Sequence, residues 1–231
     1  MAVFVLVAGC SPKSGYVYKP NPPMAGERKL PVKVAVLPFE DGTENFTKRG
    51  SALGDGKYNL AKAGISGGMS AMPPAFWGKS FADELAASGS FQSARFIYSP
   101  TEIVPDEAFT IDGILKKVNF AATFDYENEI QVIFRATRKS DKKLVWEKEV
   151  ARAWKTPRNV YAGCGMGMQC MFDKMYGDWN KWMSGALAEA RTDLVAAIAS
   201  PPESGSGSAG AGAPPAQESV DQTIDRIFKG K

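Results

Sequence analysis

Five segments carry the hydrophobic patterns of β-strands. Residues 33–39 are almost continuously apolar, with β-branched Val34 and Val36, which is typical of a strand covered on both faces. Residues 130–137 alternate apolar and polar side chains, as a half-buried antiparallel strand does. A polar turn at 139–142 predicts that this strand forms a hairpin with the strand that follows it. The remaining expected strands are 94–98, 109–120 and 144–153.

Two segments have the spacing of amphipathic helices. The first begins at Pro74, is apolar at every fourth residue and ends before Gly89. The second is predicted to begin with Asp178 as its N-cap and to end before Pro201. Their apolar positions are Trp77, Phe81 and Leu85, and then Trp179, Met183, Leu187, Ala190, Leu194 and Ile198. This order predicts an α+β fold, with an antiparallel-rich sheet of about five strands and two helices packed on one face.

Stretches rich in Pro, Gly and Ser divide the chain around one domain, residues 31–200. The last segment, 218–231, is apolar on one side but too short to be a stable helix alone, so we expect it to dock or to bind a partner. The other expected segments are a signal remnant at 1–9, a lipidated tether at 10–30, a Gly-rich insertion at 42–74, a disulfide loop at 160–177 and a flexible linker at 201–217.

The first ten residues resemble a bacterial lipoprotein signal. Residues 2–9 are wholly apolar but too short to span a bilayer, and the small residues Ala8 and Gly9 precede Cys10, which we expect to be lipidated. No Lys or Arg precedes Cys10, so we expect Met1 to lie inside a longer signal. Ser11 follows Cys10 directly, with no Asp there, and the resemblance to lipoproteins therefore implies export to the periplasmic face of the outer membrane. The alternative is that residues 1–10 form a buried strand with a core cysteine.

Composition argues against most catalytic classes. The chain of 231 residues has no histidine, which excludes Ser-His-Asp and Cys-His machinery and imidazole metal ligands. Lys and Arg exceed Asp and Glu by 28 to 25, a balance that gives no signal for nucleic-acid binding. We therefore expect a protein that is not an enzyme, with no catalytic residues, no metal and no cofactor. A carboxylate-based hydrolase stays open as a third possibility, although no pair of carboxylates has a spacing that supports it.

The remaining two cysteines, Cys164 and Cys170, lie in a Gly- and Met-rich stretch. An even number of cysteines in an oxidising compartment favours a structural disulfide between them. The alternatives are free thiols, or a periplasmic Cu(I) site in which soft sulfur ligands bind the metal. The methionines that could join such a site are Met166, Met168, Met171 and Met175.

Two groups of methionine and aromatic residues are candidates for contact with a partner, because flexible Met beside aromatics suits an adaptable surface. One group flanks the end of the Gly-rich insertion and the other lies in the disulfide loop. Their members are Met69, Met72, Phe76 and Trp77, and then Met166, Met168, Phe172 and Tyr176. The competing interpretation is that these side chains complete the edge of the core.

Four stretches resemble a group of Gram-negative envelope lipoproteins. They are VAVLPFEDGT from Val34, ADELAASGSF from Ala82, IDGIL from Ile111 and LVWEK from Leu144. The group includes the ABC-type transport auxiliary lipoproteins, the curli-channel and penicillin-binding-protein-activator lipoproteins, and the amino-terminal domain of the Tol-system β-propeller protein. The resemblance covers residues 31–200 and implies a periplasmic, membrane-anchored assembly module without catalysis. Its expected partners are the membrane, an envelope protein or lipid-linked component, and a possible second copy of the chain.

Overall fold

The computed structural model describes residues 15–24, 26–43, 58–59, 69–70, 72–121, 127–165 and 167–200. The chain divides into the units Met1–Ala199 and Ser200–Lys231. Cys10, the signal remnant, the linker at 201–217 and the segment 218–231 lie outside the described residues, so their predictions stay predictions.

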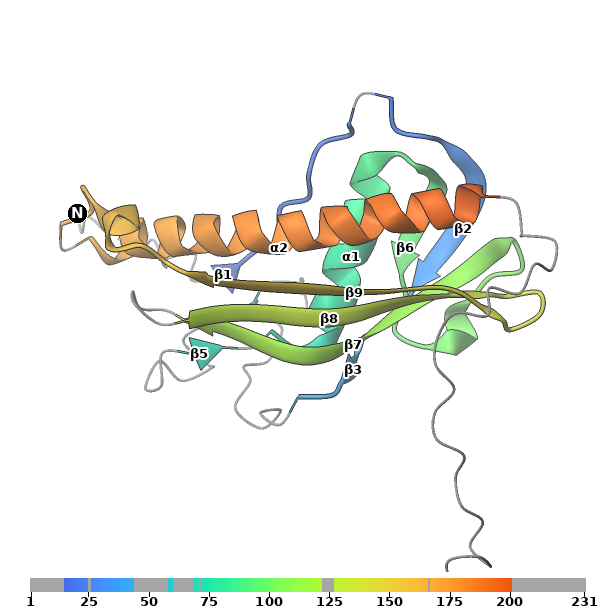
Figure 1. Ribbon diagram of the computed structural model, residues 1–231, viewed down its shortest axis with the longest axis horizontal. Helices are drawn as coiled ribbons and strands as arrows, with labels where there is room; N and C mark the ends of the chain where they lie inside the picture. Colours follow the sequence, from blue (N-terminus) through green and yellow to red (C-terminus); the bar gives the residue numbers. More distant parts are fainter. Residues whose placement is uncertain are drawn as a thin grey trace, which may run out of the picture. The chain divides into compact units, whose positions relative to one another are not determined.

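A seven-stranded sheet forms the centre of the first unit (Figure 1). Five strands follow the order β6-β2-β7-β8-β9, and two strands of two residues each, β3 and β5, also pair with β7. The strands of the main path are β2 (Leu30–Val36), β6 (Phe91–Phe96), β7 (Glu107–Ala121), β8 (Glu127–Arg138) and β9 (Leu144–Lys155). The short strands are β3 (Glu40–Asp41) and β5 (Met69–Ser70).

The sheet is mixed, so the expectation of an antiparallel-rich sheet is wrong. β2 pairs in parallel with both β6 and β7, whereas β7, β8 and β9 form an antiparallel meander. Strands β2 and β6 are parallel because helix α1 (Pro74–Ser88), which lies between them in the sequence, returns the chain to the edge of the sheet where β2 began. A hydrophobic pattern identifies a strand, but it does not encode the direction of the strand's neighbour.

Helix α1 begins and ends where its sequence predicts. Pro74 occupies the first turn, where the missing N–H removes no hydrogen bond. Gly89 ends the helix in the left-handed conformation at φ 68°, and its N–H bonds to the carbonyl of Ala86 at 3.3 Å.

Helix α2 (Met168–Ala199) begins ten residues earlier than the predicted cap at Asp178. Asp178 lies inside the helix, where its carboxylate accepts hydrogen bonds from Trp154 Nε1 at 3.1 Å and from the Thr156 hydroxyl at 2.8 Å. An Asp before an apolar stripe resembles an N-cap in sequence, but here its partners come from the end of β9 and the residue that follows. Most of the predicted loop at 160–177 is therefore helical.

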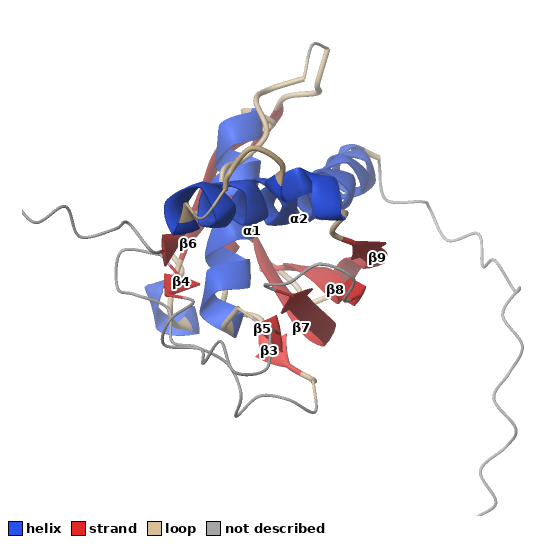
Figure 2. Cartoon of the chain, turned by 90° about the vertical axis from the view of Figure 1, so that its left-hand side faces the viewer, coloured by secondary structure: helices blue, strands red, loops and turns tan. Residues whose placement is uncertain are grey.

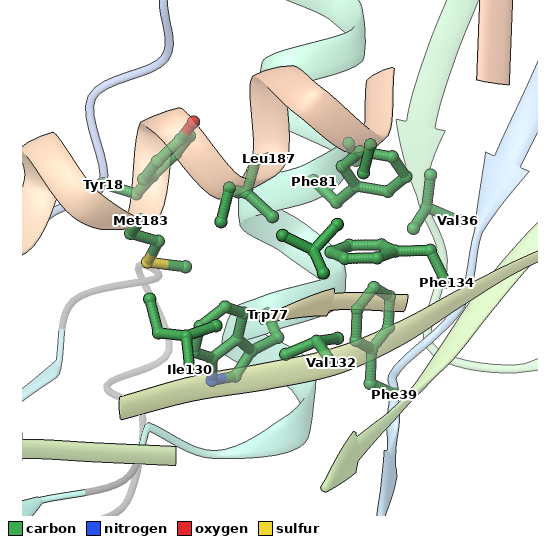
Figure 3. Packing of buried hydrophobic residues seen from close by; sticks show 14 of the residues in the cluster. Tyr18, Val36, Phe39, Trp77, Phe81, Ile130, Val132, Phe134, Met183 and Leu187 are labelled. Atoms are coloured by element: carbon green, nitrogen blue, oxygen red, sulfur yellow. The ribbon is translucent and has the colours of Figure 1, made fainter. Parts of the chain in front are cut away.

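The two helices cross one another beside the strands of the sheet (Figure 2). Side chains of both helices enter the same core with the sheet (Figure 3). Phe120 of β7 shows this directly, because its ring lies 6.2 Å from Trp77 of α1 and 5.2 Å from Trp179 of α2. Phe81 of α1 likewise contacts Phe134 of β8, with ring centroids 4.8 Å apart. The core is thus assembled from elements distant in sequence, and aromatic rings join them.

The remaining short elements are β1 (Gly15–Tyr16), which pairs with β4 (Tyr58–Asn59), and the 3-10 turns η4 (Pro100–Glu102) and η5 (Arg158–Tyr161). None of the helices in the described part of the chain combines the length and the apolar character needed to cross a bilayer.

Candidate functional site

The Sγ atoms of Cys164 and Cys170 are joined in a disulfide, with their Cα atoms 5.4 Å apart. Cys164 lies just before α2, and Cys170 lies in its first turn. Gly163 and Gly165 have φ values of 86° and 53°, a conformation that other residues rarely adopt. The Gly167 N–H bonds to the Cys164 carbonyl at 2.9 Å, so the bridge closes a tight turn at the start of the helix.

This bond engages both thiols that a Cu(I) site would need as thiolate ligands. The side chain of Met175 packs in the hydrophobic core. Within the residues that the structure describes, no cluster of three or more Cys, Asp or Glu side chains is placed to hold a metal ion. The copper interpretation therefore has no support in this geometry.

Three of the proposed contact residues belong to the core instead. Met72, Phe76 and Trp77 are at most 3% exposed, so a partner cannot reach them, and the competing interpretation as core residues is the correct one for these side chains. Phe76 and Trp77 are buried because α1 lies against the sheet with this face, and Met72 lies just before the helix. Met69 pairs with Ala121 through its backbone, while its side chain, that of Met168 and all of Met166 lie outside the described residues.

Phe172 and Tyr176 remain at the surface of α2. Both are partly exposed, and their rings stack at 6.1 Å between centroids. The Tyr176 ring also contacts Tyr16 at 5.6 Å and Trp179 at 5.7 Å. The pair therefore joins the surface of α2 to the amino-terminal segment of the described chain.

We name that segment, residues 15–24, the strap. Its residues 16–21 contact the two helices, and residues 22–24 are exposed, so most of it is not the free tether that its composition predicts (Figure 1). Tyr16 is 1% exposed and Tyr18 is 6% exposed. The Lys19 N–H donates to Asn180 Oδ1 at 2.7 Å, and Asn180 Nδ2 donates back to the Lys19 carbonyl at 3.1 Å. A Pro-rich stretch favours extended backbone, and here two tyrosines of that stretch are buried against the domain.

A buried carboxylate holds the strap. Glu84 of α1 is fully buried and accepts four hydrogen bonds at 2.7 to 3.1 Å: from the Tyr18 hydroxyl, from the N–H and the side-chain amide of Asn21, and from Arg191 Nη1. Arg191 of α2 is also fully buried, and its Nε lies 3.0 Å from Glu27 Oε1. We name these residues, Tyr18, Asn21, Glu27, Glu84 and Arg191, the Glu84 cluster.

The Glu84 cluster ties together three elements that the chain visits far apart, namely the strap, α1 and α2. Each oxygen of Glu84 accepts two hydrogen bonds, and the Arg191 guanidinium supplies the opposite charge. A carboxylate saturated in this way is suited to holding structure rather than to transferring protons.

Sequence reasoning missed this cluster, although a signal was present. Glu84 follows Phe81 by three residues, and Arg191 follows Leu187 by four, so each lies beside an apolar stripe on its helix. When two helices carry residues of opposite charge at such positions, a buried ion pair between the helices is favoured. The strap's share in the cluster had no comparable signal.

No family model matches the chain, and no curated protein matches it. Several solved structures are similar in part, and three of them are described here. They are a Xanthomonas campestris protein of the DUF330 family (12% identity, 78% of this chain and 89% of that chain, TM-score 0.45), a dodecameric PelC variant from Paraburkholderia phytofirmans (15%, 73% and 93%, 0.43) and the lipoprotein GNA1162 from Neisseria meningitidis (6%, 67% and 99%, 0.31). With TM-scores below 0.5, these likenesses say nothing about function.

The buried tyrosines predict a specific loss of stability in alkali. Burial raises the pKa of Tyr16, and burial together with the Glu84 carboxylate raises the pKa of Tyr18. Unfolded tyrosine ionises near pH 10, so above that pH the unfolded chain releases protons that the folded protein keeps. The contribution of the two buried tyrosines to the free energy of unfolding is fully present below about pH 10. Above that pH it falls by about 1.4 kcal/mol per pH unit for each tyrosine.

Urea unfolding at several pH values measures this effect. The slope of unfolding free energy against pH, above pH 10, should be shallower in the double variant Tyr16→Phe/Tyr18→Phe than in the natural chain. Comparing slopes removes any constant cost of the substitutions. Equal slopes in the two proteins would show that the tyrosines are not held neutral by docking.

Proposed function

We propose that this chain is an exported lipoprotein of the bacterial envelope, attached to the periplasmic face of the outer membrane through Cys10. Its folded domain would serve as a non-catalytic binding or assembly module of an envelope transport or biogenesis system. The observation that carries the proposal is the disulfide between Cys164 and Cys170. Such bonds persist in oxidising compartments, including the bacterial periplasm, and are rare in the cytosol.

The bonded cysteine pair and the remaining cysteine support the same proposal. Cys164 and Cys170 are bonded together, which leaves Cys10 as the chain's remaining cysteine. It follows an apolar run and two small residues, the setting in which a lipoprotein cysteine receives its lipid. The strap, which begins five residues later, supports a domain held near that anchor.

The partner surface that fits best is the exposed part of α2 near the disulfide. Phe172 and Tyr176 present a stacked aromatic pair there, and aromatic rings are enriched at interfaces because they combine apolar area with few rotatable bonds. An envelope protein or a lipid-linked component would contact this pair. A second copy of the chain is the other arrangement, and sedimentation analysis of the purified protein distinguishes them.

Metabolic labelling with a fatty-acid analogue tests the anchor. The natural chain, expressed behind an intact lipoprotein signal, should incorporate the label and fractionate with outer membranes. The variant Cys10→Ala should incorporate none, because the thiol that receives the lipid is gone. Equal labelling of the two proteins would contradict the proposal.

Mass spectrometry of the protein isolated without reducing agent tests the compartment. We expect the peptides that contain Cys164 and Cys170 to be recovered as a bonded pair from cells that export the chain. Free thiols on both residues, with copper bound, would instead favour the Cu(I)-binding interpretation.

A further inference from the structure

The docked strap restricts where the membrane can lie relative to the domain. This inference rests on the proposed attachment of lipid at Cys10. Only residues 11–14 separate Cys10 from Gly15, where the strap begins, and Tyr16 is already buried. Even a fully extended chain places Cys10 within about 20 Å of Tyr16. The lipid is therefore confined to the surroundings of one point on the domain.

That point lies on the amino-terminal half of α2. The Tyr16 ring contacts Tyr176 at 5.6 Å and Trp179 at 6.0 Å, and its hydroxyl donates to Asn180 Oδ1 at 3.2 Å. Helix α2 has 32 residues and is about 48 Å long. Asp193 of α2 accepts a hydrogen bond from Trp146, near the start of β9, and lies about 21 Å from Trp179 along the helix axis. The β8–β9 turn, residues 139–143, lies further still (Figure 1).

The surface near Tyr16 is basic. In residues 15–24 and 155–182 there are five basic side chains, all exposed, against two carboxylates. One carboxylate, Asp178, is already bonded to Trp154 and Thr156. The five basic residues are Lys19, Lys155, Arg158, Lys174 and Lys181. We name this surface the basic end.

A partly exposed tryptophan lies among these charges. Lys181 Nζ is 5.8 Å from the centre of the Trp182 ring, which stacks on Trp154 at 5.1 Å. Phe172 and Tyr176 are each two positions from Lys174 on α2, so their side chains leave the helix on the side opposite to that lysine. Lysine beside tryptophan is a composition found where proteins meet the headgroups of a bilayer.

We infer that the basic end faces the bilayer and that anionic phospholipid headgroups are what it contacts. The position of the anchor brings this end to the membrane, and its net positive charge complements negatively charged lipid. The β8–β9 turn and the strands near it face away from the membrane.

Lysine footprinting on vesicles tests the orientation. The full chain is coupled through the Cys10 thiol to maleimide lipid in vesicles that contain phosphatidylglycerol, while the disulfide keeps the other cysteines unreactive. Amine acylation is then measured by mass spectrometry on the free and coupled proteins. We expect several-fold slower acylation of Lys174 and Lys181 after coupling, and unchanged acylation of Lys142 and Lys143 in the β8–β9 turn. Equal protection at both ends overturns the orientation.

Two controls separate the parts of the inference. On vesicles of phosphatidylcholine alone, the protection of Lys174 and Lys181 should fall, and full protection there overturns the role of anionic lipid. Chemical coupling places the anchor at Cys10 whether or not the cell lipidates it. A negative result in fatty-acid labelling would thus refute the anchor, whereas a negative result in footprinting would refute the orientation.

Discussion

Replacing Arg191 by Met is expected to lower the free energy of unfolding by about 3–5 kcal/mol, the usual cost of leaving a buried charge without its partner. Arg191 donates to Glu84 Oε1 at 2.7 Å, and both side chains are fully buried. Without the guanidinium, the Glu84 carboxylate must either remain charged in the core or take up a proton. Urea denaturation followed by tryptophan fluorescence measures the change.

The partner variant and a surface pair make this result interpretable. In the double variant Arg191→Met/Glu84→Gln the charge of Glu84 is removed as well, and only Glu27 loses its ionic partner, so the loss should be smaller than the sum of the two single losses. Lys79→Met breaks an ion pair with Asp83 on the exposed side of α1, the helix that carries Glu84, and should cost about 0.5 kcal/mol or less. Additive losses in the double variant, or equal losses for Arg191→Met and Lys79→Met, would mean that the buried pair has no special role.

Replacing Gly78 by Ala is expected to destabilise the protein by about 3 kcal/mol, at the upper end of the usual cost of overpacking. A Cβ atom at this position of α1 would lie 2.3 Å from the carbonyl oxygen of Leu37 and 3.1 Å from the Phe96 ring. Because the closest atom belongs to the backbone, the helix itself must move away from the sheet. Gly78 is therefore required for the close approach of α1 to the chain after β2.

Gly185→Ala is the matched control for this prediction. Gly185 lies on the exposed side of α2, and a Cβ there meets no atom within 4 Å. Alanine at this position should stabilise the protein by about 1 kcal/mol through helix propensity alone. Thermal and urea unfolding of both variants should thus give shifts of opposite sign, and a shift of the same sign in both would contradict the packing described here.

Much of the secondary structure follows from local patterns. Helix α1 begins at Pro74 and ends before Gly89 because proline and glycine have strong positional preferences that tertiary contacts seldom override. The β8–β9 hairpin follows from alternation around a polar turn in which Asp141 accepts a hydrogen bond from the Lys143 N–H at 3.2 Å. The predicted start of α2 is wrong because Asp178 resembles a cap in sequence, while its hydrogen bonds go to residues 24 and 22 positions away.

The residues of the candidate site could likewise be predicted only in part from the sequence. Phe172 and Tyr176 could be selected from composition, and they do lie at the surface. Met72, Phe76 and Trp77 satisfied the same criterion but are buried, because a helical spacing of apolar residues does not say which of them the sheet will cover. Residue type alone therefore cannot separate an exposed aromatic from a core aromatic.

The sequence by itself determined the strands of the meander, helix α1, the absence of histidine chemistry and the candidate lipid attachment at Cys10, since all of these depend on residue types and short-range spacing. Only the tertiary structure decided that β2 and β6 are parallel, that Glu84 and Arg191 meet in the core and that residues 15–24 are docked. Each of these joins residues more than 50 positions apart. Such contacts form because burial and charge pairing depend on distances in space, which the order of residues along the chain does not specify.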